Sequence, residues 1–198
     1  MPEDRTLIGR VTRCSTRGFV GAMRLPEPDL PVFGSFCKAE AQHGQSQVVG
    51  LIYDISIEDD ELARQLATAE DLPPEQLADS QKNRQVPVEY SALAVGYLDG
   101  AEFVQRIPPQ PPLTLAPIRA LSQDEVRLFT TRLDFIPLIF SAPNLPADDL
   151  LAAALQHAAA IRPEHERRPF LLDAAQACAR LLSFDLARLE TLLQNLQP

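Results

Sequence analysis

Cysteine and histidine are the side chains of this 198-residue chain that could bind a metal ion or act in nucleophilic catalysis. There are three of each, namely Cys14, Cys37, Cys178, His43, His157 and His165. Zinc requires ligands that converge, and a nucleophilic cysteine requires a nearby base. Only Cys37, next to Lys38 and six residues before His43, comes near that pattern. Because Cys37 falls in an alternating segment typical of a strand, a buried thiol is the commoner interpretation. We therefore expect no metal site and no catalytic cysteine.

Paired carboxylates and glycine-rich loops are the other patterns that could support catalysis or bind a cofactor. Acidic pairs stand at 59–60, 70–71 and 148–149, where expected helices begin or end and the helix dipole explains them. No serine lies in a G-x-S-x-G elbow. All eight glycines lie in the first 100 residues, and none is in the G-x-x-x-x-G-K-[ST] frame of a phosphate-binding loop. We therefore expect no catalytic residues, no cofactor and no enzymatic activity.

The net charge of −9 disfavours general nucleic-acid binding, which depends on cations set against phosphates. One arginine-rich segment stands out in the first 24 residues, with Arg10, Arg13, Arg17 and Arg24. The first interpretation is that these side chains lie on the solvent face of the first strands. The alternative is a local basic stripe that contacts nucleic acid.

Cysteine usage and the opening residues bear on the compartment. Three widely spaced cysteines indicate reduced thiols rather than a disulfide scaffold. The opening MPEDR contains no apolar signal segment, and the longest apolar stretches are interrupted before they could span a membrane. We therefore expect a cytoplasmic protein with no membrane association.

The confinement of glycine to the first 100 residues predicts a turn-rich β half followed by a helical half. Short β-compatible runs occupy residues 7–13, 18–25, 33–40, 47–57, 86–98 and 101–107. Six short strands with glycine corners suggest a small closed or nearly closed barrel over residues 1–107. Residues 58–85 interrupt it with a helical insertion, which would act as a lid or contact a partner.

Several segments of the first half resemble the HAS-barrel domain, the β-barrel shared by HerA-type DNA-translocating ATPases and the catalytic-ring subunits of rotary ATP synthases. They are IGRVTRCSTRGFVGAM, VFGSFCKAE, QVVGLIYDI, SALAVGYLDG and the proline-rich RIPPQPPLTLAPIRALSQDEV. The resemblance spans residues 6–121. In those ATPases a P-loop motor domain follows the barrel, whereas residues 101–198 of this chain contain no glycine. The resemblance therefore implies an accessory barrel that forms rings or docks partners, without ATP hydrolysis.

The second half predicts a stiff proline-rich connector over residues 108–121 and an all-α helical bundle over residues 122–198. Ser122 and Glu125 have the spacing of a capping box, which places a helix start there. Further helices are expected over residues 146–160, from 164 or 169 to 182, and over 185–196 from their apolar spacing.

Two apolar groups in this half could lie at a protein interface. The first is the FIPLIF segment, with Phe135, Ile136, Leu138, Ile139 and Phe140. We expect it to pack between the barrel and the helices, and an exposed binding patch is the alternative. The second is the seam of the last helix, Leu186, Leu189, Leu193 and Leu196. It would close the chain's own bundle or meet a second copy or partner helix.

The fold expectation is therefore α+β, with a HAS-like barrel, a proline-rich connector and a helical domain. The first functional hypothesis is a non-enzymatic interaction and assembly module, whose partner by resemblance is a separate P-loop ATPase or a second copy of the chain. The second is a barrel that binds nucleic acid through its arginines. The third is a small-molecule binder or enzyme with a pocket between the two halves.

Overall fold

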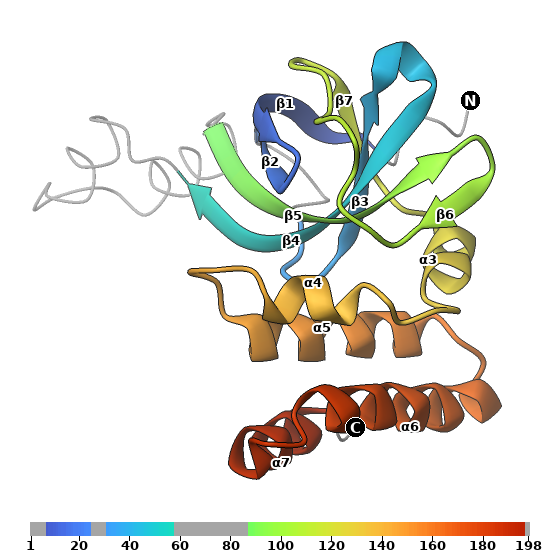
Figure 1. Cartoon of the computed structure of the whole chain (residues 1–198). Coiled ribbons are helices and arrows are strands. Elements are labelled where there is room, and N and C mark those ends of the chain that lie inside the picture. Colours follow the sequence, from blue (N-terminus) through green and yellow to red (C-terminus); the bar gives the residue numbers. More distant parts are fainter. Residues whose placement is uncertain (1–6, 25–30, 58–86, 197–198) are drawn as a thin grey trace, which may run out of the picture.

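The computed structural model describes residues 7–24, 31–57 and 87–196, and shows an α+β protein (Figure 1). An antiparallel β-barrel forms one end of the molecule, and five α-helices follow it among the described residues. The barrel expected from the glycine-rich first half is thus confirmed. The helical insertion expected over residues 58–85 lies outside the described residues.

Six antiparallel strands close the barrel in the order β2-β1-β7-β3-β4-β5, with β5 pairing back onto β2. The strands are β1 (Leu7–Ser15), β2 (Gly18–Arg24), β3 (Phe36–Ala41), β4 (Ser46–Ile57), β5 (Pro87–Asp99), β6 (Glu102–Val104) and β7 (Pro117–Ala120). The short strand β6 pairs with β5 as a hairpin and is not part of the closed ring. Closure leaves the six barrel strands without a free edge along most of their length.

Strand β7 differs from the expectation for this part of the chain, because it lies within the proline-rich segment predicted to be only a connector. It enters between β1 and β3, where Ile118 pairs with Gly9 on one side and Ala39 on the other. Its proline, Pro117, is the first residue of the strand, a position that tolerates the missing N–H donor. The barrel therefore extends to Ala120, and β7 rather than the 101–107 segment completes it.

The barrel interior is filled by side chains. Gly21 faces Tyr90 and Ile118 so closely that a Cβ atom added to it would lie 2.5 Å from both. The Tyr90 hydroxyl donates a hydrogen bond of 2.9 Å to the backbone oxygen of Ile8, which satisfies this polar group within the core. The interior is therefore a packed core and not a channel.

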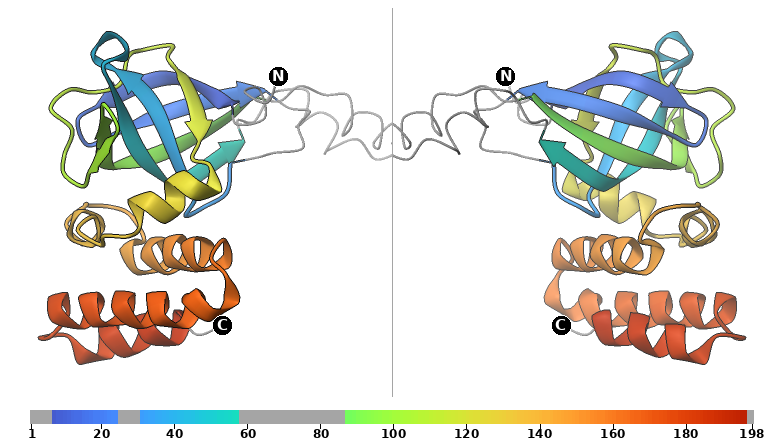
Figure 2. Two further views of the ribbon diagram at one scale, coloured as in Figure 1. Left: turned by 90° about the vertical axis from the view of Figure 1, so that its right-hand side faces the viewer. Right: turned by 90° about the vertical axis from the view of Figure 1, so that its left-hand side faces the viewer.

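Four helices of the second half begin within one or two residues of a predicted start, whereas the one in the FIPLIF segment was not predicted as a helix. The helices are α3 (Gln123–Phe129), α4 (Ile136–Phe140), α5 (Ala147–Ala160), α6 (Glu164–Leu181) and α7 (Leu186–Asn195). The predicted capping box is confirmed, because the Ser122 hydroxyl accepts from the Glu125 N–H and the Glu125 carboxylate accepts from the Ser122 N–H. Figure 2 shows α4 and α5 in a layer beneath the barrel, with α6 and α7 in a second layer beyond them.

The barrel and the helices share one hydrophobic core. Phe36 on the outer face of β3 lies 5.5 Å from Phe129 of α3 and 5.8 Å from Phe135, measured between ring centroids. The same cluster continues along the outer faces of β4 and β5 through Leu51 and Leu93. These strands are therefore apolar on both faces, one toward the barrel interior and the other toward the helices.

Hydrogen bonds from Gln105 connect the exit of β6 to the loop between α3 and α4. Its side-chain amide donates to the backbone oxygens of Phe129 and Arg132, at 2.5 and 3.0 Å, and accepts from the Phe135 N–H at 3.0 Å. Lys38 on β3 forms an ion pair with Glu125 in the first turn of α3. Polar contacts thus fix the first helix to the barrel on both sides of the aromatic cluster.

Two arginines join the helices to one another. Arg162, which is buried, donates to the Thr130 hydroxyl at 2.7 Å, and its guanidinium stacks 3.8 Å above the centre of the Phe170 ring. Arg188 of α7 forms a two-pronged salt bridge with Asp148 of α5, at 2.8 Å from each of the two guanidinium nitrogens involved. Arg162 thus links α3 and α6 just after the C-terminal end of α5, and Arg188 links α7 to the N-terminal end of α5.

Replacing Phe129 with alanine should lower the free energy of unfolding by about 3–5 kcal/mol, because it removes a fully buried ring from the shared core. The matched control is Phe184→Ala, which removes the same group from a fully exposed position and should change stability by less than about 0.5 kcal/mol. Urea unfolding followed by circular dichroism measures both. Equal losses for the two variants would contradict the shared core.

Replacing Glu125 with glutamine should reduce stability at neutral pH by up to about 1 kcal/mol, because the ion pair with Lys38 is lost while the capping-box hydrogen bond is kept. Partial burial opposes ionisation of Glu125, yet the hydrogen bonds from Lys38 and Ser122 outweigh it and hold its pKa below the usual 4.5. The extra stability of wild type over Glu125→Gln is thus fully present above about pH 4.5 and is lost as the pH falls through the pKa of Glu125 in the folded protein.

Urea unfolding at neutral pH and at about pH 3 measures this difference. The matched control is Glu102→Gln, at an exposed carboxylate that forms no ion pair with the described residues. An advantage of wild type over Glu125→Gln that persists unchanged in acid would show that the ion pair does not contribute.

Candidate functional site

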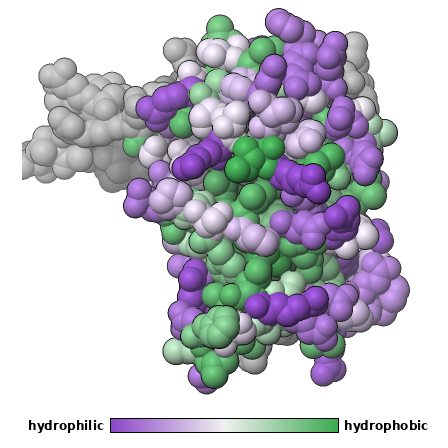
Figure 3. Space-filling view, viewed as in Figure 1, coloured by the Kyte–Doolittle hydropathy of each residue, from purple (hydrophilic) through white to green (hydrophobic). Residues whose placement is uncertain are grey.

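A groove of about 750 Å³ lies between the barrel and the helices. Most of its lining comes from the tip of the β1–β2 hairpin, the middle of β5, and the segment from α4 to the loop before α5. Tyr53 of β4 and Ile107, which follows β6, complete it. Figure 3 shows hydrophobic residues gathered between the barrel and the helices on the face of the molecule drawn there. We call this the hairpin groove, and it is the candidate functional site.

Aliphatic side chains make up much of the hairpin groove. Leu93 comes from the outward-facing side of β5 and belongs to the core shared with the helices. Leu138 and Leu145 reach it from α4 and from the loop that follows, and Ile107 reaches it from the chain that leaves β6. Ile107 is 55% exposed, so the groove presents apolar surface to solvent.

Two arginines, Arg13 and Arg17, line the hairpin side of the groove. Both are exposed, and neither guanidinium forms an ion pair with any residue that the structure describes. The turn between them is fixed by the Ser15 hydroxyl, which accepts from the Arg17 N–H at 3.2 Å and donates to the Gly18 oxygen at 3.3 Å. The groove therefore has a positive rim on a well-defined turn.

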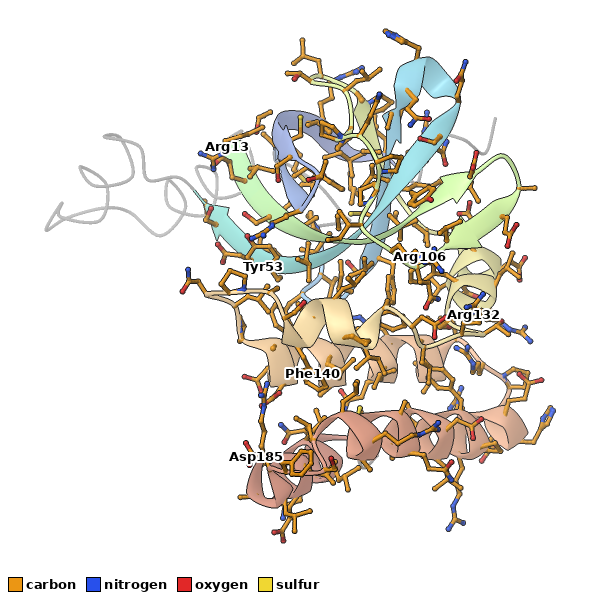
Figure 4. The ribbon with its side chains drawn as sticks, in the orientation of Figure 1. Arg13, Tyr53, Arg106, Arg132, Phe140 and Asp185 are labelled. Carbon is orange, nitrogen blue, oxygen red and sulfur yellow. The ribbon has the colours of Figure 1, made fainter. Side chains whose placement is uncertain are left out.

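Hydroxyl groups are the remaining polar groups of the groove. Tyr53, which is half-buried, projects from β4 toward the same side of the molecule as Arg13 in Figure 4. Ser91 comes from β5, and Ser141 donates a hydrogen bond of 3.2 Å to the Leu138 oxygen. The other aromatic residue of the lining, Phe19, is buried in the barrel, so Tyr53 offers the groove its accessible ring.

The four arginines singled out by the sequence do not gather at one place. Arg13 and Arg17 line the hairpin groove, whereas Arg10 donates a hydrogen bond of 3.1 Å to the Leu115 oxygen and is not part of its lining. The side chain of Arg24 lies outside the described residues. The described arginines of the predicted basic stripe are thus divided between the groove and the site where Arg10 contacts Leu115.

The FIPLIF segment is mainly a packing element. Phe135, Ile136 and Ile139 are fully buried in the core that joins the barrel to the helices, which confirms the packing interpretation for these three side chains. Leu138 instead lines the groove. Phe140 is half-buried, and the Arg188 guanidinium lies 5.0 Å from its ring centre.

The leucine seam of the last helix is used mostly within the chain itself. Leu196 is buried, and Leu189 and Leu193 pack against the shared core, whereas Leu186 is 71% exposed. Leu192, which is not part of the predicted seam, is fully buried. The buried face of α7 is therefore rotated from the predicted one. Leu186 remains at an exposed apolar corner with Leu181 and Phe184.

The remaining candidates for chemistry are buried or dispersed. Burial raises the pKa of the Cys37 thiol and raises that of Cys178 to about 11, so both are protonated and unreactive at neutral pH. Within residues 7–24, 31–57 and 87–196, no three histidine, cysteine or acidic side chains are placed to share a metal ion. Nor does any helix in these ranges have the length and apolar character needed to cross a membrane.

Sequence reasoning singled out Arg13, Arg17 and Leu138 and raised a pocket between the two halves as its third hypothesis, but it did not identify the other lining residues. Leu93 and Ser91 stand on β5 two residues apart, a spacing that puts them on one face of the strand, but this pattern does not say which helix lies opposite. Ile107 was expected in a return strand, and the structure places it just after β6. No protein-family model matches the chain, and no curated protein matches it either.

Alkylation of the native protein should modify Cys14 and spare the other two cysteines. Cys14 lines the groove and is partly exposed, whereas Cys37 and Cys178 are buried with raised pKa values. Brief treatment with iodoacetamide at about pH 8, followed by peptide mass spectrometry, should therefore give one adduct. The same treatment in urea should give three. Rapid labelling of Cys37 or Cys178 in the native protein would show that the core is more open than described.

Proposed function

We propose that this chain is a non-enzymatic interaction and assembly module, accessory to a separate HerA-type DNA-translocating ATPase. The observation that carries the proposal is the hairpin groove, which combines exposed apolar surface with two arginines that form no ion pair with the described residues. The identity of the partner rests on the resemblance of residues 6–121 to HAS barrels. In this view the chain supplies the barrel and the partner supplies the motor.

Protein binding fits the composition of the groove. Ile107 is a solvent-exposed aliphatic residue next to the less exposed Leu93 and Leu138. Covering such groups with a partner removes apolar surface from water and stabilises the complex. Arginine is enriched at protein interfaces, and it is among the residue types that contribute most to the binding free energy. A volume of about 750 Å³ also lies in the range of small-ligand sites, but the groove opens to solvent and would leave a small molecule partly uncovered.

The helices complete the proposed module as a C-terminal bundle that holds the barrel and offers a second surface. This surface is the exposed corner formed by Leu181, Phe184 and Leu186. A protein with two separate apolar surfaces can hold two partners, or a partner and a second copy of itself. We place the module in the cytoplasm, where reduced thiols and a DNA-translocating ATPase would both be found.

Nucleic-acid binding is a weaker candidate. This hypothesis requires the arginines of the first two strands to act together. Arg13 and Arg17 line the groove, whereas Arg10 donates a hydrogen bond to the backbone oxygen of Leu115, outside the groove. The net charge of −9 adds a general repulsion from phosphates.

Replacing Ile107 with glutamate should weaken binding to a purified HerA-type ATPase from the same organism by at least about tenfold, because it puts a charge into the apolar part of the groove. The substitution is at an exposed position and should leave folding intact. Sedimentation velocity on mixtures of the two proteins measures the complex, and the chain alone reports self-association as a mass above 21.9 kDa.

The matched control is Leu128→Glu, which makes the same substitution at an aliphatic residue of α3 that is 60% exposed and outside the groove. This variant should bind as wild type does. A wild-type chain that sediments as a monomer and forms no complex with the ATPase would refute the proposed function.

A further inference from the structure

The two sides of the hairpin groove differ in chemistry. The side formed by the hairpin carries Arg13 and Arg17, while the opposite side, from α4 to α5, carries Leu138, Ala142 and Leu145. Among the described residues that line the groove, none is acidic. An occupant that satisfies both sides must therefore present negative charge along one edge and apolar groups along the other.

The positive rim is a local exception on an acidic protein. The chain has 27 acidic residues against 18 lysines and arginines, yet β1 and its turn contain three arginines and no acid. Arginines on this protein commonly have partners, as Arg188 has with Asp148 and Arg127 has with Glu166. Arg13 and Arg17 form no such pair with the described residues, so their charges are available to an external carboxylate or phosphate.

The apolar side of the groove distinguishes between these two sources of negative charge. Single-stranded nucleic acid is held by aromatic rings on which successive bases stack. Of the aromatic residues in the described lining, only Tyr53 offers an accessible ring for this purpose, because Phe19 is 3% exposed. Leucine and isoleucine instead provide pockets for aliphatic side chains, which a peptide has and a nucleic acid lacks.

We infer that the hairpin groove binds a short segment of a partner protein in which acidic residues alternate with, or flank, aliphatic ones. Carboxylates of the segment pair with Arg13 and Arg17, and its aliphatic side chains cover Leu93, Ile107 and Leu138. The inference rests on the proposed function in that it specifies the partner chemistry for the same groove, and it holds for any partner that carries such a segment.

The test selects short random peptides displayed on phage against the intact chain. The selected sequences are synthesised, and their binding to the protein is measured by fluorescence anisotropy. We expect the selected peptides to share aspartate or glutamate next to leucine, isoleucine or valine. Binding should fall by about tenfold in the double variant Arg13→Glu/Arg17→Glu.

The matched control is Arg168→Glu/Arg180→Glu, which changes the net charge equally at two exposed positions of α6 outside the groove. This variant should bind the peptides within about twofold of wild type. Circular dichroism and the single-adduct labelling of Cys14 confirm that both double variants keep the native fold.

Three outcomes would overturn the inference: selected peptides without acidic residues, equal binding to the two double variants, or no enriched peptide. Tighter binding of single-stranded oligothymidine than of the peptides, with the same dependence on Arg13 and Arg17, would assign the groove to nucleic acid instead.

Failure of the proposed function is distinguishable from these results. If the ATPase binds wild type and Arg13→Glu/Arg17→Glu equally, the module stands and the inference fails. If peptides bind as expected but the ATPase does not bind, the inference stands and the ATPase is the wrong partner.

Discussion

The structure depends on one constraint: the outer faces of β4 and β5, together with Phe36 at the start of β3, form an apolar patch that must be covered. An isolated barrel with Phe36, Leu51 and Leu93 on its surface would expose a large hydrophobic patch. The rings of Phe129 and Phe135 cover this face, with Phe129 5.4 Å from Phe103 and 5.5 Å from Phe135. The barrel and the helices are therefore joined through a continuous core, which requires the helices to remain attached to the barrel.

The position of the groove follows from where this cover ends. Helices α4 and α5 are held against the barrel by close packing, so close that a Cβ atom added to Gly34 would lie 2.5 Å from the Cβ atom of Ala153. The cover does not extend to the tip of the β1–β2 hairpin. Leu93 thus belongs to the core and also borders the groove. Apolar surface is exposed at this boundary because the helices bury the part of the barrel's apolar outer face beneath them and leave the part next to the hairpin uncovered.

Local sequence patterns predicted the elements of the fold better than their assembly. The distribution of glycine marked β1 to β5, although β6 and β7 lie beyond the last glycine. The Ser122–Glu125 box marked the start of α3, because a capping box acts within a few residues. Strand β7 was missed because four residues after a proline-rich run show no alternation long enough to recognise. A pocket between the two halves was one hypothesis from the sequence, but its lining could not be derived, since Arg13, Leu93 and Leu138 meet only through barrel closure and helix packing. Periodicity shows which face of an element is apolar but not which element will lie opposite it.

Charge and apolar burial have different roles in such a groove. At physiological ionic strength, charges separated by more than about 8 Å are largely screened, so the acidic surface elsewhere does not cancel Arg13 and Arg17 for a ligand in contact with them. Exposed ion pairs contribute little free energy individually, whereas burial of Ile107 and its neighbours is not screened by salt. Apolar contact therefore supplies most of the affinity, and the arginines determine which segments bind and in which orientation. Salt should weaken binding only in part, unlike the steep loss that defines a phosphate-driven complex.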